Sequence, residues 1–393
     1  MSYLFSVIGL VVIIAIAFLI STDKKAVKLK PLILMFVLQL VLGFILLRTT
    51  FGTIMVSGLA SVFDHLLTFA SAGVDFVFGG LANKGSAPFF LTVLMPIIFI
   101  SAILGILRYI KILPWFMRLV GFLLSKINGL GKLESYNGVA SAILGQSEVF
   151  ISVKKELPFL SEKRLITMAL SAMSTVSMSI VGSYMALIDS KYVITALILN
   201  LFGGFIIASI VNPYELDASD DELIIEEDES QTFFQMLGEY ILDGFHVATT
   251  VAAMLIGFVA LIAMINAIFN SIFGISFQEI LGFVFSPFAF LAGIPWDEAV
   301  DAGSIMATKL VTNEFVAMTE LAKGTYAFSA HTTAILSVFL VSFANFSSIG
   351  IISGAIKGLN EEKGNLVAKH GLKILLSATL VSFLSAIITG LLV

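Results

Sequence analysis

The 393-residue sequence has no cysteine, only four histidines and few charged residues. The absence of cysteine excludes disulfide bonds, iron–sulfur clusters and thiolate zinc sites. The histidines are scattered without metal-ligand spacing, which argues against a bound transition metal; they are His65, His246, His331 and His370. The net charge is −5 and no long basic tract is present, so nothing points to nucleic-acid binding. We expect neither a metal nor an organic cofactor.

Apolar residues are correspondingly frequent in this sequence. They make up 58% of the chain, against 12% for charged residues, whereas soluble domains are about 45–50% apolar and about 25% charged. Apolar runs of about 20 residues are typical of membrane-spanning helices. We identify eight such runs, at 4–21, 31–47, 89–108, 165–188, 192–211, 238–270, 330–354 and 371–392. The sequence therefore predicts an all-α polytopic membrane protein.

Lysine and arginine indicate how the chain crosses the membrane. No cleavage site follows the first apolar run, so we interpret it as a span, and lysines 24, 25, 28 and 30 place its end in the cytoplasm. With eight spans, both termini are expected outside. On this topology 17 of the 22 basic residues lie on the cytoplasmic side and 5 do not. This bias supports the orientation.

Two segments fit no simple span. Residues 134–155 and 297–325 contain too many polar residues to cross lipid alone, yet each must enter and leave on one side. Such backbone is tolerated at membrane depth only inside protein or beside a water-filled cavity. We therefore predict two re-entrant helical hairpins, one entering from the cytoplasm and the other from outside.

The two hairpins begin matching units. The sequence at 141–150 (SAILGQSEVF) overlays that at 307–316 (ATKLVTNEFV), which pairs Leu144 with Leu310 and Glu148 with Glu314. A span with a polar centre follows each hairpin, and one plain span follows that. Inverted repeats of this kind are typical of secondary transporters, whose sites form at the midplane from interrupted helices.

The predicted units follow from this repeat. They are scaffold spans 1–3 at 1–111, a cytoplasmic interfacial helix at 112–133, the first repeat at 134–212, an acidic linker at 213–237, a scaffold span at 238–275, an external interfacial helix at 276–296 and the second repeat at 297–393. We expect the linker to be a solvated loop without chemistry of its own.

The polar groups of the hairpins suggest a neutral substrate. A charge at the bilayer centre costs about 2.5–3.5 kcal/mol on insertion scales, so Glu148 and Glu314 need a function or a partner, for which Lys309 is one candidate. No arginine lies near either hairpin tip, which disfavours a phosphate or carboxylate substrate. Carboxylates, amides and hydroxyls suit a sugar diol together with a base edge. The serines of 174–179 have two interpretations, a contribution to the substrate site or ordinary packing between membrane helices.

At these residues the sequence resembles the concentrative nucleoside transporters, in particular their bacterial branch. The motifs that carry the resemblance are GQSEVF (145–150), STVSMSIVGSYM (174–185), GSIMATKLVTNEFVAM (303–318) and VSFANFSSIGIISG (341–354). The resemblance implies a trimer in which hairpins and broken spans move as an elevator against a scaffold. It assigns the nucleobase to Gly145, Gln146, Ser147, Glu148 and Ile180, and the ribose to Glu314, Asn345 and Ser348, with Phe343 close by.

The resemblance also indicates where a coupling ion would bind. The positions are Ser141, Leu144, Thr175 and Val176, and Ser141 stands where sodium-coupled members have an asparagine. Loss of that amide oxygen weakens a site for a hard cation. Burial favours the neutral form of a carboxylate, so Glu148 or Glu314 is the natural proton carrier. We expect proton-driven import of nucleosides, with pyrimidine nucleosides such as uridine favoured, across a bacterial plasma membrane.

Other functions stay open on the sequence alone. They are sodium coupling, transport of another neutral metabolite such as a free nucleobase, a passive channel, and an intramembrane enzyme. The enzyme is disfavoured because a serine nucleophile needs an adjacent base, and no histidine lies near the first hairpin.

Overall fold

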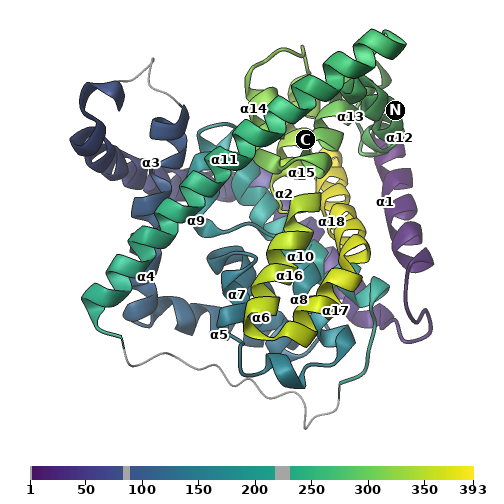
Figure 1. Ribbon diagram of the computed structural model, residues 1–393. Coiled ribbons are helices and arrows are strands. Elements are labelled where there is room, and N and C mark those ends of the chain that lie inside the picture. Colours follow the sequence, from purple (N-terminus) through teal and green to yellow (C-terminus); the bar gives the residue numbers. More distant parts are fainter. Residues whose placement is uncertain (1, 83–88, 217–230) are drawn as a thin grey trace.

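A computed structural model describes residues 2–82, 89–216 and 231–393, and Figure 1 shows it as a bundle of helices. The N-terminal part contains α1 (Ser2–Leu19), α2 (Leu29–Arg48), α3 (Thr50–Phe78), η1 (Gly79–Ala82), η2 (Phe90–Leu94), α4 (Ile97–Tyr109) and α5 (Ile112–Ser125). No strand occurs among the described residues, which confirms the all-α prediction. Most of the predicted acidic linker, residues 217–230, lies outside the described part of the chain.

Each predicted repeat begins with two interrupted helical segments. The first contains α6 (Lys132–Leu144), α7 (Glu148–Ile151), η3 (Leu157–Phe159), α8 (Glu162–Ser174), α9 (Met178–Met185) and α10 (Ser190–Val211). The second contains α13 (Trp296–Val311), α14 (Glu314–Ala322), α15 (Ala330–Leu340), α16 (Phe346–Leu359), α17 (Glu361–Lys369) and α18 (Gly371–Leu392). In both, a helix–break–helix hairpin precedes a broken span and then a continuous helix. The short polar helix α17 was not predicted.

Seven helices of the described chain are long and apolar enough to cross a membrane, and the bent pair α12 (Phe277–Leu291) and α13 would add one more. The predicted list of eight spans did not include α3. Asp64, His65 and Asp75 interrupt its apolar pattern, and its hydropathy of 1.4 is the lowest of the seven. Figure 1 shows α3 running across the direction of α1 and α18.

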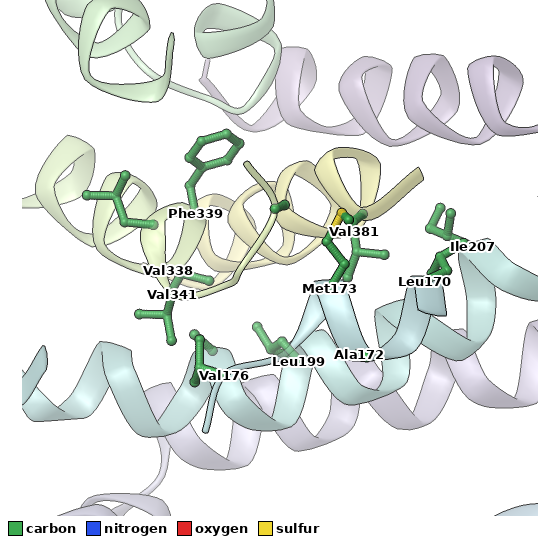
Figure 2. Packing of buried hydrophobic residues seen from close by; sticks show 14 of the residues in the cluster. Leu170, Ala172, Met173, Val176, Leu199, Ile207, Val338, Phe339, Val341 and Val381 are labelled. Atoms are coloured by element: carbon green, nitrogen blue, oxygen red, sulfur yellow. The ribbon is translucent and has the colours of Figure 1, made fainter. Parts of the chain in front are cut away.

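The continuous helices of the two repeats form the centre of the molecule. Helices α10 and α18 pack on each other, on α2 and on the broken spans, and most of their residues are buried. Figure 2 shows part of this layer, with Val176 and Val341 from the two breaks and Leu199 from α10. The amide of Asn200 on α10 donates to the carbonyl of Val341 at 2.5 Å. The central layer therefore holds both breaks.

The outer helices leave apolar surface uncovered. Helix α11 (Phe233–Phe273) has 41 residues, so it is about 60 Å long, about twice the thickness of the hydrocarbon core. Only 6% of its most apolar 18-residue stretch is buried against the rest of this chain. It packs mainly on α4, where Gly244 approaches the backbone of Ile98. Lipid or other subunits must cover the rest.

Both termini lie at the same end of the bundle, toward the top of Figure 1. The rings of Phe5 and Phe290 are 4.3 Å apart, and the side chain of Arg48 donates to the carbonyls of the last two residues. At the other end, Lys163 donates to the carbonyl of Pro213 and Lys363 to that of Leu160. The predicted cytoplasmic lysines therefore gather opposite the termini.

The interface between α12 and α13 gives the first prediction. A Cβ atom on Gly303 would lie 2.6 Å from the carbonyl oxygen of Gly282 and 2.9 Å from the nitrogen of Ser286, and neither backbone atom can move freely. We expect Gly303→Ala to cost about 1–3 kcal/mol through overpacking, seen as a lower unfolding midpoint in detergent. The control is Gly350→Ala on α16, where the new methyl group meets open space. Equal midpoints in the two variants would contradict this packing.

Candidate functional site between the two repeats

The tip of the first hairpin contacts the break of the first broken span. Gly145 has φ +118°, which is strained for any residue with a Cβ, and a Cβ there would lie 2.6 Å from the carboxylate of Glu148. The Ser177 hydroxyl donates to the carbonyl of Leu144 at 3.1 Å and lies 2.8 Å from that of Ser179. Hydroxyl groups of the broken span thus satisfy the carbonyl end of α6.

Glu148 opens into a cavity of about 560 Å³. Leu144, Ser177 and Ser179 line one side of it, and the other side comes from α4, α5 and α11 and includes Arg108, Lys111, Tyr240 and Asp243. Arg108 and Lys111 belong to the predicted cytoplasmic set, so this side of the cavity lies toward the lysine-rich end. The first hairpin tip therefore borders a cavity at that end.

The other two polar residues of the tip are less exposed than Glu148. Gln146 is buried, and its side-chain carbonyl oxygen has no hydrogen-bond partner among the described residues. Ser147 is half-buried. A buried polar atom without a partner costs about 1–3 kcal/mol, so the Gln146 oxygen needs a partner from elsewhere. Ile180, also assigned to this half of the site, lies buried on α9.

The tip of the second hairpin joins both repeats through Glu314. Its carboxylate accepts a hydrogen bond from the Tyr184 hydroxyl at 2.8 Å and one from the Asn345 amide at 3.1 Å. Tyr184 belongs to α9 of the first repeat and Asn345 to the second. The preceding residue, Asn313, caps α14 by accepting from the nitrogen of Val316 at 3.0 Å. The two hydrogen bonds therefore fix this carboxylate between the repeats.

The Asn345 side chain makes hydrogen bonds with both its oxygen and its amide group at the break of the second broken span. Its side-chain oxygen caps α16 by accepting from the Ser348 nitrogen at 2.9 Å, which leaves its amide free to bind Glu314. The Ser348 hydroxyl is buried without a partner among the described residues. Close by, the nitrogen of Phe343 donates to the carbonyl of Thr175 at 3.1 Å. The two breaks are thus hydrogen-bonded to each other.

The four residues expected to coordinate a coupling ion come from two elements, Ser141 and Leu144 from α6 and Thr175 and Val176 from the break between α8 and α9. The Ser141 hydroxyl donates to the carbonyl of Asn137 at 2.6 Å, and the Thr175 hydroxyl is 3.3 Å from the carbonyls of Ser171 and Ala172. Val176 is fully buried, and the carbonyl of Leu144 already accepts from Ser177. The hydroxyls therefore act as donors to nearby carbonyls in this structure.

The two glutamates have different surroundings. Glu148 faces the cavity, whereas Glu314 does not line it and is enclosed by Tyr184 and Asn345. Lys309, the candidate partner for Glu314, donates instead to three other oxygens. Tyr184 was not among the predicted site residues, because a tyrosine in an apolar run is ordinarily a packing residue. The only signal was its place in the motif at 174–185.

Two opposed hairpins, two broken spans and unpartnered polar atoms between them define the class, a secondary transporter built from inverted repeats. Three family models cover the chain: the N-terminal domain of Na+ dependent nucleoside transporters matches residues 8–81, a nucleoside recognition domain 90–191, and the C-terminal domain of the same transporters 192–390. The chain belongs to the concentrative nucleoside transporter family. The resemblance and the exclusion of an enzyme are confirmed.

Individual relatives agree along the full length. The chain is 37% identical to the purine nucleoside transport protein NupG of Bacillus subtilis, with all of both chains covered. It is 32% identical to the nucleoside permease NupC of Helicobacter pylori, over 99% of this chain and 98% of that one. The structure of CNTnw in an inward-facing substrate-bound state matches with a TM-score of 0.94 and 32% identity, over 100% of this chain and 98% of that one. The chain is therefore a nucleoside transporter.

The contact between Tyr184 and Glu314 gives the second prediction. Tyr184→Phe removes one of the two donors to the carboxylate while keeping the ring, and a hydrogen bond to a charged group is worth about 1.5–3 kcal/mol. We expect weaker nucleoside binding, measured by calorimetry on purified protein. Tyr192→Phe makes the same chemical change on α10 and serves as the control. If both variants bind like the unsubstituted protein, Tyr184 does not position Glu314.

Proposed function

We propose that this protein is a proton-driven symporter that imports nucleosides, with uridine as a favoured substrate, by an elevator-type movement. The observation that carries the proposal is the Glu314 carboxylate, held between the repeats by Tyr184 and Asn345. A carboxylate fixed in this way can accept hydrogen bonds from the paired hydroxyls of a ribose.

The proposed site has two halves. Gly145, Gln146, Ser147, Glu148 and Ile180 hold the nucleobase, and Glu314, Asn345, Ser348 and Phe343 hold the ribose. The unpartnered oxygen of Gln146 supports the first half, because a base edge offers an amide-like donor. The unpartnered hydroxyl of Ser348 supports the second. A nucleoside between them would satisfy both buried atoms.

Proton coupling is supported by the residue at position 141. A serine there lacks the carboxamide oxygen that favours sodium. A carboxyl group in the membrane costs less when neutral, so Glu148, which the cavity reaches, is the proposed proton carrier and Glu314 the second candidate. Sodium at Ser141, Leu144, Thr175 and Val176 is the alternative, and the names of the matching family models favour it.

The proposed assembly is a homotrimer in a bacterial plasma membrane with both termini outside. The uncovered apolar face of α11 leaves surface for other subunits as well as for lipid, and the trimer is what the family resemblance implies. With the lysine-rich end in the cytoplasm, the cavity at Glu148 corresponds to an inward-facing state. The hairpins and broken spans would then carry the site outward as one body against α4 and α11.

Purine nucleosides are the second candidate substrate, since NupG is named as a purine nucleoside transport protein. Competition separates the two. If unlabelled uridine inhibits the uptake of labelled uridine at a lower concentration than inosine does, the result supports the pyrimidine preference. If inosine inhibits at the lower concentration, the result supports purines. Free uracil should compete poorly if the ribose half of the site contributes.

The coupling ion is tested with labelled uridine and proteoliposomes in which proton and sodium gradients are imposed separately. We expect an inward proton gradient to accelerate uptake in sodium-free buffer, because a carboxyl group carries the coupling charge. An inward sodium gradient at equal pH on both sides should leave the rate unchanged. Uptake that follows sodium and ignores pH would contradict proton coupling.

Glu314→Gln tests the ribose half of the site. The substitution keeps the shape and removes a charged acceptor worth about 1.5–3 kcal/mol, so we expect the KM for uridine to rise roughly tenfold or more. Glu361→Gln is the control, because Glu361 lies exposed beside Lys357 and a surface pair contributes little. An unchanged KM in Glu314→Gln would remove Glu314 from the site.

A further inference from the structure

Lys309 is a fully buried cation on α13, near the tip of the second hairpin. Its ammonium group donates to the carbonyl of Phe339 at 2.6 Å, to the hydroxyl of Ser342 at 2.7 Å and to the hydroxyl of Ser382 at 3.1 Å. It also lies 4.5 Å from the centre of the Phe339 ring. An ammonium has three donors, and each of them has an oxygen partner here.

The carbonyl end of one half-helix, α15, accepts from this ammonium, and Lys309 itself lies in the last turn of another, α13. Helix α13 ends at Val311, two residues after Lys309, and α15 ends at Leu340, one residue after Phe339. The C-terminal end of a helix carries a partial negative charge and unpaired carbonyls, and both favour a cation. In secondary transporters such half-helix ends coordinate the coupling cation. The surroundings of the Lys309 nitrogen are thus those of a cation site.

The first repeat contains the same arrangement without a lysine. There α6 ends at Leu144 and α8 at Ser174, and the Leu144 carbonyl accepts a hydrogen bond from Ser177 of the break. Because Leu310 pairs with Leu144, Lys309 pairs with Ile143, whose side chain has no charge. The proposed ion-coupling residues lie at these helix ends. In the first repeat the corresponding place therefore has no cation supplied by the protein.

We propose that Lys309 is a tethered cation which holds the carbonyl end of α15 and the second break in place, a function that no cationic side chain performs at Ile143, the matching position of the first repeat. As a positioning residue, Lys309 ties α13 to the second break and to Ser382 on α18. Ser342 begins the segment that leads to Asn345, so the charge on Lys309 fixes the break that presents Asn345 to Glu314.

Lys309→Met and Lys309→Ala test this role in complementary ways. Methionine fills a similar volume without a charge, and we expect uridine uptake to fall roughly tenfold or more, which corresponds to about 1.4 kcal/mol. Alanine leaves a space lined by the same oxygens. A small cation that enters this space should stabilise the variant. We therefore expect methylammonium chloride or sodium chloride to raise the unfolding midpoint of Lys309→Ala more than that of the unsubstituted protein. Choline chloride at equal ionic strength is the reference salt for both proteins.

Lys323→Met, an exposed lysine in the same hairpin, is the matched control and should transport normally. Ser382→Ala keeps the lysine and removes one acceptor, and we expect a smaller loss of uptake. The sodium response of the unsubstituted protein tests the first-repeat site separately. The proposal is overturned by normal uptake in Lys309→Met or Ser382→Ala, or by a Lys309→Ala variant whose midpoint responds to the three salts as the unsubstituted protein does.

Discussion

Backbone groups that leave a helix inside a membrane must find partners within the protein, and this constraint governs the whole structure. Helices α6, α8, α13 and α15 end at the hairpin tips and at the breaks of the two repeats. The ends of the first pair are satisfied largely by hydroxyls, such as that of Ser177 on Leu144. At the second pair, the Thr312 hydroxyl donates to the carbonyl of Thr308 at the end of α13, and Lys309 donates to the carbonyl of Phe339 at the end of α15. The breaks also bind each other through Thr175 and Phe343.

The same constraint shapes the proposed binding site between the repeats. Asn345 caps α16 with one end of its side chain and binds Glu314 with the other, while Tyr184 reaches Glu314 from the first repeat. The Gln146 oxygen and the Ser348 hydroxyl are among the buried polar atoms that have no partner within the described residues. Buried polar atoms without partners are costly. A nucleoside that supplies those partners would bind where the fold leaves them unsatisfied.

Much of this architecture could be predicted from the sequence because polar residues in apolar runs are expensive and so mark breaks. The polar centres at 171–185 and 341–354 became the breaks before α9 and α16, and the hairpins fell where Glu148 and Glu314 interrupt their segments. Helix α3 was not predicted as an apolar helix, because Asp64 and Asp75 lower its hydropathy. With 29 residues it is nevertheless long and apolar enough to cross a membrane.

The side-chain contacts of the site were harder to predict. Matched positions in two repeats indicate that Glu148 and Glu314 are related, but their surroundings depend on residues that the repeat does not share. Tyr184 gives Glu314 a donor, whereas the cavity leaves Glu148 open. Lys309 was an exception to the charge bias along the chain, and only the tertiary structure shows the three oxygens around it.

The most direct test of the account is a cryo-electron microscopy structure of the protein with uridine bound. The account predicts density for one nucleoside between the tips of the two hairpins, with the base at Gln146 and the ribose at Glu314 and Ser348. Density confined to the outer part of the cavity, beside Arg108 and Tyr240, with Gln146 and Ser348 still without partners, would contradict it.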